Sequence, residues 1–259
     1  DLYANIRPAR TYEGVKTITG AFDLVVVREN TEGFYADRNM EAGSGEVLVT
    51  PDVAISMRRI TRPCCERIAR SAFELAMQRN RHVTLVHKHN VLKVTDGMFL
   101  DACRQVAAEF PEVRVDDFIV DAMMAHVVRA PERFDVIVTT NMFGDILSDL
   151  TAELSGSLGL AGSMMASDET CCAQAQHGSA PTIAGQDIAN PTSMILSVAM
   201  MVRWVGDKRG HRGLQQAGDA MAAAVDQVLA NPASRTRDIG GSIGCKAFGQ
   251  AVAQAVAAA

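Results

Sequence analysis

Phe134-Asp-Val-Ile-Val-Thr-Thr-Asn-Met-Phe-Gly-Asp-Ile-Leu-Ser-Asp149 is the stretch in which a short β-branched run gives way to a helical pattern. The run 134–140 is short enough to be a buried strand, and a helix is expected from Asp145 to about Gly156. Asp145 and Asp149 stand four residues apart, so both carboxylates are expected on one face of the first helical turns. A strand that leads into a helix is the building unit of α/β proteins.

The same alternation continues on both sides of this stretch. Further β-branched runs predict buried strands at 22–28, 82–87 and 113–120. Helical patterns predict helices at 60–79, 95–110, 121–130, 192–206, 211–230 and 245–258. The sequence therefore predicts the α/β class with a largely parallel sheet. The polar segment 37–51 is expected to be an excursion from that core. The late helices have few predicted strands to cover, which predicts that the second half lacks the strands of its own sheet.

The composition is that of an ordinary soluble globular protein. Of the 259 residues, 48% are hydrophobic and 21% are charged, which is enough apolar material for a sizeable core. A formal charge of −5 with scattered basic residues argues against a nucleic-acid partner. The longest strongly apolar stretch, 195–202, is too short to cross a bilayer, so no membrane partner is expected. The six cysteines contain no Cys-x-x-Cys and are interpreted as reduced thiols of a cytoplasmic protein.

Two sets of residues suggest chemistry by themselves. Asp145 and Asp149 offer the oxygen ligands that Mg²⁺ prefers, although Asp145 could equally favour a helix N-terminus while Asp149 is solvated. Arg28 ends a predicted strand, where ligands of open α/β sheets gather, and Tyr35 follows seven residues later. Arg28 could hold a substrate carboxylate and Tyr35 could transfer a proton. The alternative is a surface arginine paired with Glu29 or Glu32 and a core tyrosine.

Five blocks, in order along nearly the whole chain, resemble a known family. They are Val-Arg-Glu-Asn-Thr-Glu-Gly-Phe-Tyr (27–35), Val-His-Lys-His-Asn-Val-Leu-Lys (86–93), Val-Asp-Ala-Met-Met (120–124), Thr-Asn-Met-Phe-Gly-Asp-Ile-Leu-Ser-Asp (140–149) and His-Gly-Ser-Ala-Pro (177–181) through Asn190-Pro191. Together they resemble the isocitrate, homoisocitrate and isopropylmalate dehydrogenases, which are metal-dependent and β-decarboxylating.

The resemblance implies a fold of two α/β domains with a central cleft. Residues 1–152 would form the substrate, metal and dimerisation domain, and residues 153–259 the C-terminal part of the nucleotide-binding domain. Family members carry another substrate arginine, a substrate-selecting helix and further strands upstream of Arg7. The family's N-terminal segment is therefore expected to be missing here, leaving one domain incomplete.

The resemblance also implies roles for individual residues. Arg7 and Arg28 would bind the carboxylates of a malate-like substrate. Asp145 and Asp149 would hold Mg²⁺ or Mn²⁺, joined by Asp121 from a second subunit of a homodimer. Lys88 matches the catalytic lysine, also supplied across the dimer, and Tyr35 would protonate the enol product. Outside the family, Lys88 would be a solvated lysine, Asp121 a helix N-cap and Arg7 a surface charge.

No Rossmann glycine fingerprint is present. The resemblance instead implies that the cofactor contacts are Asn90, His177, Gly178, Ser179, Ala180, Pro181 and Asn190. No Lys or Arg lies between His177 and Pro191, which favours NAD over NADP because a 2′-phosphate usually recruits a cation. Two positions depart from the family pattern: Thr182 stands where NAD-using relatives have Asp, and Gln174 stands where relatives generally have Glu.

These inferences predict an enzyme that oxidises and decarboxylates a 3-substituted malate. Asn30 and Glu32 resemble the isocitrate and homoisocitrate branch, so isocitrate is the favoured substrate, with homoisocitrate, isopropylmalate and tartrate as alternatives. A second hypothesis is a non-catalytic or regulatory subunit of such a dehydrogenase. Against this hypothesis, a chain without catalytic activity has no reason to keep all six residues that the resemblance assigns to catalysis and binding. They are Arg28, Tyr35, Lys88, Asp121, Asp145 and Asp149.

Overall fold

The computed structural model describes residues 1–35, 40 and 42–258. The chain divides into two compact units, Asp1–Ile6 with Leu24–Ser148 and Arg7–Asp23 with Asp149–Ala259. The architecture is α/β, as the sequence predicts. Residues 36–39, 41 and 259 lie outside the described residues, and 37–39 and 41 of these belong to the expected excursion.

The first unit is built on a parallel sheet of strand order β6-β5-β7-β2. Its strands are β2 (Asp23–Glu29), β5 (His82–His87), β6 (Arg114–Ile119) and β7 (Val136–Thr139). Every residue of β5 and β7 is buried. The continuous apolar runs in the sequence reflect this, because a strand covered on both faces has no solvent-facing side.

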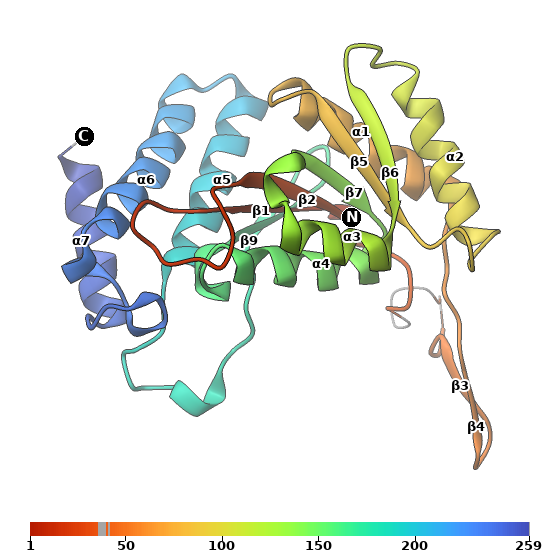
Figure 1. Ribbon diagram of the computed structural model, residues 1–259, viewed down its shortest axis with the longest axis horizontal. Coiled ribbons are helices and arrows are strands. Elements are labelled where there is room, and N and C mark those ends of the chain that lie inside the picture. Colours follow the sequence, from red (N-terminus) through yellow and green to blue (C-terminus); the bar gives the residue numbers. More distant parts are fainter. Residues whose placement is uncertain (36–39, 41, 259) are drawn as a thin grey trace. The chain divides into compact units, whose positions relative to one another are not determined.

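Four helices accompany this sheet: α1 (Arg62–Met77), α2 (Thr95–Ala107), α3 (Val120–Arg129) and α4 (Asn141–Leu154). In Figure 1, α1 and α2 lie side by side next to β5 and β6. Phe73 of α1 and Phe99 of α2 are fully buried with Leu85 and Val138 of the strands. The apolar stripes of both helices therefore form one core with the sheet.

A two-stranded hairpin extends away from the rest of its unit (Figure 1). Its strands are β3 (Glu46–Thr50) and β4 (Val53–Ser56), which pair antiparallel with a register shift between Leu48 and Thr50. Every residue of both strands is exposed. Part of the polar excursion 37–51 is thus a strand whose apolar side chains have no core in this chain.

The second unit contains its own strands, contrary to the expectation from the sequence. β1 (Ala4–Arg10) passes from the first unit into the second, where the strand order is β1-β8-β9 with β8 (Gly162–Ala166) antiparallel to β9 (Cys171–Ala175). Helix α5 (Thr192–Arg209) packs on β8 and β9, α6 (Arg212–Ala230) on α5, and α7 (Cys245–Ala257) on α6. Short 3₁₀ helices lie at Pro131–Arg133, Leu158–Leu160, Pro181–Ile183, Pro232–Ser234 and Arg237–Ile239.

The boundary between the units differs from the expected division at residue 152. It falls within α4, after Ser148, and Arg7–Asp23 belongs to the second unit. Tyr12 and Val15 of that segment are buried with Leu160 and Val225. The Tyr12 hydroxyl also donates to the Leu160 carbonyl at 3.1 Å. Burial and this hydrogen bond explain why a segment from the start of the chain joins the late helices.

No helix in the described part of the chain is both long and apolar enough to span a bilayer.

Candidate active site

The carboxyl ends of four parallel strands in the first unit lead to predicted site residues. Arg28 is the penultimate residue of β2, Lys88 directly follows β5, and Asp121 is the second residue of α3, which follows β6. Asp145 lies one turn into α4, which follows β7. Parallel strands end at one edge of a sheet, which is where α/β proteins bind ligands. Since β2 neighbours β7 and β5 neighbours β6, these residues are brought together in two groups.

Arg28 forms the first group by contacting three side chains. Its Nε donates to Asn141 Oδ1 at 2.8 Å, its Nη2 donates to the Tyr35 hydroxyl at 2.9 Å, and its Nη1 donates to the Asp145 carboxylate. The Tyr35 hydroxyl in turn donates to Asp145 Oδ2 at 2.9 Å. The Arg28 side chain is 6% exposed and that of Asp145 is 39% exposed. Arg28 is therefore not the surface arginine paired with Glu29 or Glu32 that the alternative expected.

Gly144 allows α4 to approach Arg28 closely. A Cβ at Gly144 would lie 2.7 Å from Arg28 Cβ and Cγ and 3.2 Å from Thr139 Cγ2. Asn141, the first residue of α4, also donates from Nδ2 to the Glu32 carbonyl at 2.9 Å. The helix begins four residues earlier than predicted, because Gly144 is a packing glycine inside it rather than its boundary.

The surroundings of Tyr35 keep its phenol protonated. Burial raises the pKa of Tyr35, the Arg28 charge lowers it, and the Asp145 carboxylate raises it again, with a net upward direction. A phenol with a raised pKa carries its proton at neutral pH and is suited to donate it.

Lys88 and Asp121 form the second group. Lys88 Nζ donates to Asp121 Oδ1, and this contact lowers the pKa of the Asp121 carboxyl. The first helical residue of α3 is Val120, and Ile119 occupies the N-cap position without a side-chain cap. The alternative of a helix-capping Asp121 is therefore wrong. The resemblance implies that Lys88 and Asp121 both serve the active site of a neighbouring subunit. In the structure of one chain they contact each other.

The second unit holds the remaining charged candidates. Arg7 of β1 lies 3.6 Å from Asp149 of α4, and the Arg7 side chain is 10% exposed. Gln176 Nε2 donates to the same Asp149 oxygen at 3.3 Å. Arg7 is thus a buried arginine with a carboxylate partner, and the surface-charge alternative does not hold.

Known proteins resemble this chain over nearly its whole length. The family model described as isocitrate/isopropylmalate dehydrogenase matches residues 1–252. The chain belongs to this family. It is 45% identical to the 3-isopropylmalate dehydrogenase of Archaeoglobus fulgidus over 97% of this chain and 72% of the relative. It is 46% identical to the isocitrate/homoisocitrate dehydrogenase of Thermus thermophilus over 99% and 72%. The isocitrate dehydrogenase structure from Methylococcus capsulatus superposes with a TM-score of 0.88 at 41% identity, over 98% of this chain and 73% of that one.

The donor set of α4 fits the divalent metal that this dehydrogenase family implies. Asp145 and Asp149 are hard oxygen donors on one continuous helix, and their side chains are 39% and 55% exposed. In the described part of the chain, no three His, Cys, Asp or Glu side chains gather at a metal-binding distance. Completing a six-ligand shell therefore requires oxygens from water, substrate or another subunit.

The loop assigned to the cofactor in this dehydrogenase family is exposed at Gly178, Ser179, Ala180 and Pro181. The His177 ring Nδ1 lies 2.8 Å from the Gly178 carbonyl. Asn190 is buried: its Oδ1 accepts from the Thr192 amide at 3.0 Å, and its Nδ2 donates to Asp238 at 2.9 Å. Asn90 lies in the other unit, exposed in the turn after β5.

The residues that suggested the isocitrate branch have internal partners. The Glu32 carboxylate accepts from the Thr61 amide at 2.8 Å and the Thr61 hydroxyl at 3.0 Å, where Thr61 precedes α1. Asn30 Nδ2 donates to the Leu2 carbonyl at 3.0 Å. In this dehydrogenase, both side chains therefore support the fold, which weakens them as indicators of substrate.

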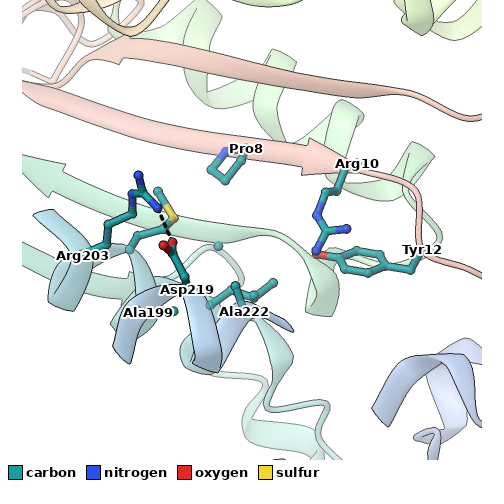
Figure 2. Close-up of a pocket in the computed structure, with 11 residues that line it drawn as sticks. Pro8, Arg10, Tyr12, Ala199, Arg203, Asp219 and Ala222 are labelled. Atoms are coloured by element: carbon teal, nitrogen blue, oxygen red, sulfur yellow. Dashed lines mark hydrogen bonds and ion pairs between the residues drawn. The ribbon is translucent and has the colours of Figure 1, made fainter. Parts of the chain in front are cut away.

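A separate hollow of about 180 Å³ lies in the second unit (Figure 2). Arg10 and Tyr12 line one side, with the Arg10 guanidinium 4.3 Å from the Tyr12 ring centre, and the paired Arg203 and Asp219 line another. None of the predicted site residues is among the described residues that line it.

The sequence interpretation did not identify several residues of the candidate site. Asn141 orients Arg28, and Gln176 contacts Asp149. Arg58 and Asp96 form a buried ion pair, and Asp96 accepts a hydrogen bond from the Lys88 backbone amide. Of these residues, only Asp96 has a position that the sequence could have indicated, because acidic residues are favoured in the first turn of a helix by its dipole. Its complete burial is not visible in the sequence.

Proposed function

We propose that the protein is an NAD-dependent enzyme that oxidises and decarboxylates a 3-substituted malate, with isocitrate as the favoured substrate. The observation that supports this most is the convergence of Arg28, Tyr35 and Asp145 at the carboxyl ends of neighbouring strands. Membership of the dehydrogenase family supports oxidation with β-decarboxylation. The choice of isocitrate as substrate and of NAD as cofactor is our own inference in addition to the family.

Each residue of this chain has a task in the proposed reaction. Arg28 and Arg7 would bind substrate carboxylates, for which a guanidinium is suited by its paired donors. Lys88 would take the proton from the substrate hydroxyl as its carbon is oxidised. After carbon dioxide leaves, Tyr35 would protonate the enol carbon and yield a 2-oxo acid. The raised pKa of Tyr35 supports this role.

Asp145 and Asp149 would hold Mg²⁺ or Mn²⁺, together with Asp121 of a second subunit. Bound NAD would accept the hydride, and the bound cation would withdraw electrons from the new carbonyl. The exposed loop His177–Pro181 and Asn190 would bind the adenosine part of the cofactor, with Asn90 as a further contact. NAD is preferred to NADP because no Lys or Arg lies between His177 and Pro191.

A homodimer with shared sites is part of the proposal. The hairpin β3–β4 exposes Leu48 to 70% and Ile55 to 52%, and an isolated two-stranded hairpin is marginally stable in water. Ile146 of α4 is also 53% exposed. Exposed apolar side chains of this kind favour a protein partner, and a second copy of the chain would supply Lys88 and Asp121. All six cysteines are free, and we propose a cytoplasmic location.

The test is a substrate panel. The purified full-length protein is incubated with NAD or NADP, Mn²⁺, and isocitrate, homoisocitrate, isopropylmalate or tartrate, while reduced nicotinamide and carbon dioxide are measured. We expect isocitrate to give the highest kcat/KM, NAD to be preferred, and a chelator to abolish turnover. Oxidation without carbon dioxide release would refute the decarboxylating reaction. Silence with every substrate, together with intact ligand binding, would favour the regulatory subunit.

A further inference from the structure

Arg58 and Asp96 form a buried ion pair that no proposed catalytic step uses. Arg58 lies between β4 and α1, and Asp96 lies in the first turn of α2. Their side chains are 7% and 0% exposed, and Arg58 Nη1 donates to Asp96 Oδ1. The Arg58 guanidinium carbon also lies 5.4 Å from the Phe143 ring centre and 5.9 Å from that of Phe34.

The pair connects directly to the segment that carries Lys88. The second oxygen of Asp96, Oδ2, accepts the Lys88 backbone N–H at 2.6 Å. The Lys88 carbonyl accepts from the Leu92 amide at 2.8 Å, and the Leu92 carbonyl accepts from the Asp96 amide at 3.0 Å. The turn after β5 is thus closed onto Asp96, and Lys88 Nζ extends from that turn to Asp121.

Arg58 also contacts the strand end that precedes α4. Its Nη2 donates to Thr140 Oγ1 at 3.0 Å, while Nη1 donates to Thr95 Oγ1 at 2.9 Å. Thr140 immediately precedes Asn141, the partner of Arg28. One guanidinium therefore joins the turn that bears Lys88 to the start of the helix that bears Asp145.

A buried ion pair of this kind is poorly explained by stability alone. Removing two charges from water costs about as much as their attraction returns, and apolar replacements are often neutral or stabilising. What the pair does provide is directional hydrogen bonding among three segments.

We propose that Arg58 and Asp96 are the positioning pair for Lys88: Asp96 fixes the Lys88 backbone, and Arg58 fixes Asp96. This inference rests on the proposed function only in taking Lys88 as the proton acceptor. Neither Arg58 nor Asp96 touches the reacting atoms. They determine where the ammonium group of Lys88 lies and how firmly Asp121 holds it.

The test compares Arg58→Met, Arg58→Lys and Asp96→Asn with the unaltered protein. The reactivity of Lys88 towards a small acylating ester is located by peptide mass, alongside kcat, KM and thermal unfolding. Misplacement of a catalytic group by about an ångström costs up to about 100-fold in rate. We therefore expect Arg58→Met to lower kcat by about 10- to 100-fold while KM changes by less than about 3-fold. Lys88 should be acylated several-fold faster, because its Nζ is then no longer held against Asp121 and is more accessible to the ester.

Arg58→Lys keeps the positive charge but cannot donate to Thr95, Asp96 and Thr140 at once. Its kcat and its rate of Lys88 acylation should therefore lie between those of Arg58→Met and the unaltered protein. The matched control is Arg79→Met. Arg79 also pairs with a buried aspartate, donating from Nε to Asp135 Oδ1 at 2.7 Å, but Asp135 precedes β7 at the opposite end of the strand. Arg79→Met should lose thermal stability while keeping normal kcat and Lys88 acylation.

The proposal is overturned if folded Arg58→Met matches the unaltered protein in kcat and Lys88 acylation. It is equally overturned if Arg79→Met loses as much kcat for the same loss of thermal stability. Where Arg58→Met does not fold, Asp96→Asn takes its place, because an amide has one acceptor oxygen and cannot serve both Arg58 and Lys88. Acylation needs no turnover, so it tests the pair even if the substrate panel shows no activity.

Discussion

Arg28 donates to three different side chains through three different nitrogens, and the tyrosine and the carboxylate that it contacts also contact each other. A guanidinium can do this because its donors form a rigid planar fork, whereas an ammonium is a point charge on a flexible stem. The positions of Asn141, Tyr35 and Asp145 consequently depend on an arginine at residue 28, and a positive charge alone would not be enough.

Replacing Arg28 by Lys should therefore impair the site without removing its charge. We expect KM for the hydroxy acid to rise by about 10- to 100-fold, because paired hydrogen bonds to a carboxylate are lost. Steady-state kinetics with the best substrate measures this. Arg70→Lys is the control, since Arg70 pairs with Glu109 on the surface, and exposed pairs contribute little. Equal KM values for both variants would contradict the role of Arg28.

Tyr12 gives a prediction about pH. Burial raises its pKa from 10.0 to about 12, and Arg10 opposes the rise. As the pH increases past the ordinary value, the unfolded chain loses this proton before the folded chain does. The free energy of unfolding should therefore fall between about pH 10 and about pH 12, by roughly 2–3 kcal/mol from this group. Urea unfolding of the protein and of Tyr12→Phe across this range tests it, and parallel pH curves would refute it.

At the scale of elements, α4 depends on a helical glycine. Gly144→Ala would place a methyl group 2.7 Å from Arg28 carbons, so we expect a loss of about 1–3 kcal/mol in stability and lower turnover as Arg28 is displaced. The matched control is Gly249→Ala in α7, where, apart from neighbouring residues and the helix's own backbone, no atom of the described residues lies within 4 Å of the new Cβ. There the better helix propensity of alanine should stabilise by up to about 1 kcal/mol. Thermal unfolding compares the two, and a stabilised Gly144→Ala would contradict this account.

The sequence predicted the elements whose side chains repeat a clear pattern. Strands β2, β5, β6 and β7 and the seven α-helices of the described residues lie close to their expected positions, because β-branched runs and amphipathic periods indicate burial directly. β1 was missed because Pro8 and two arginines interrupt its apolar residues. β8 and β9 were missed because Gly, Ala, Ser and Cys carry little strand preference.

The site was predictable only in part. The sequence analysis predicted Arg28, Tyr35 and Asp145 as site residues. Their contact depends on β2 and β7 being neighbours in the sheet. The order of strands in a sheet cannot be inferred from the local sequence pattern of each strand. Asn141 and Arg58 could not be recognised, since a buried polar residue looks the same in sequence as an exposed one. The metal, cofactor and subunit assignments remain proposals.

At the scale of the whole molecule, the proposed sharing of sites can be tested by complementation. Lys88→Met and Asp145→Asn should each be inactive alone. A hybrid dimer would combine both defects in one site and leave the other intact. Random mixing makes about half of all dimers hybrid, so about a quarter of full activity should return. Activity of the refolded mixture is measured against each variant refolded alone, and no recovery would mean that each chain uses its own Lys88.

The hairpin β3–β4 should control assembly. Leu48→Asp introduces a charge on its exposed apolar surface, and we expect the dimer to dissociate in sedimentation experiments because burying that charge is costly. Ile18→Asp is the control, since Ile18 is 83% exposed and lies outside the hairpin. If both variants sediment like the unaltered protein, the hairpin is not the contact.

Helix α4 begins in one compact unit and ends in the other, with Asp145 and Asp149 on either side of the boundary. The regular turn of the helix therefore sets the angle between the two carboxylates. Deleting a single residue between these carboxylates would turn one relative to the other by about 100° and shift it by about 1.5 Å. This part of the gene should accept many substitutions during evolution but almost no change in length.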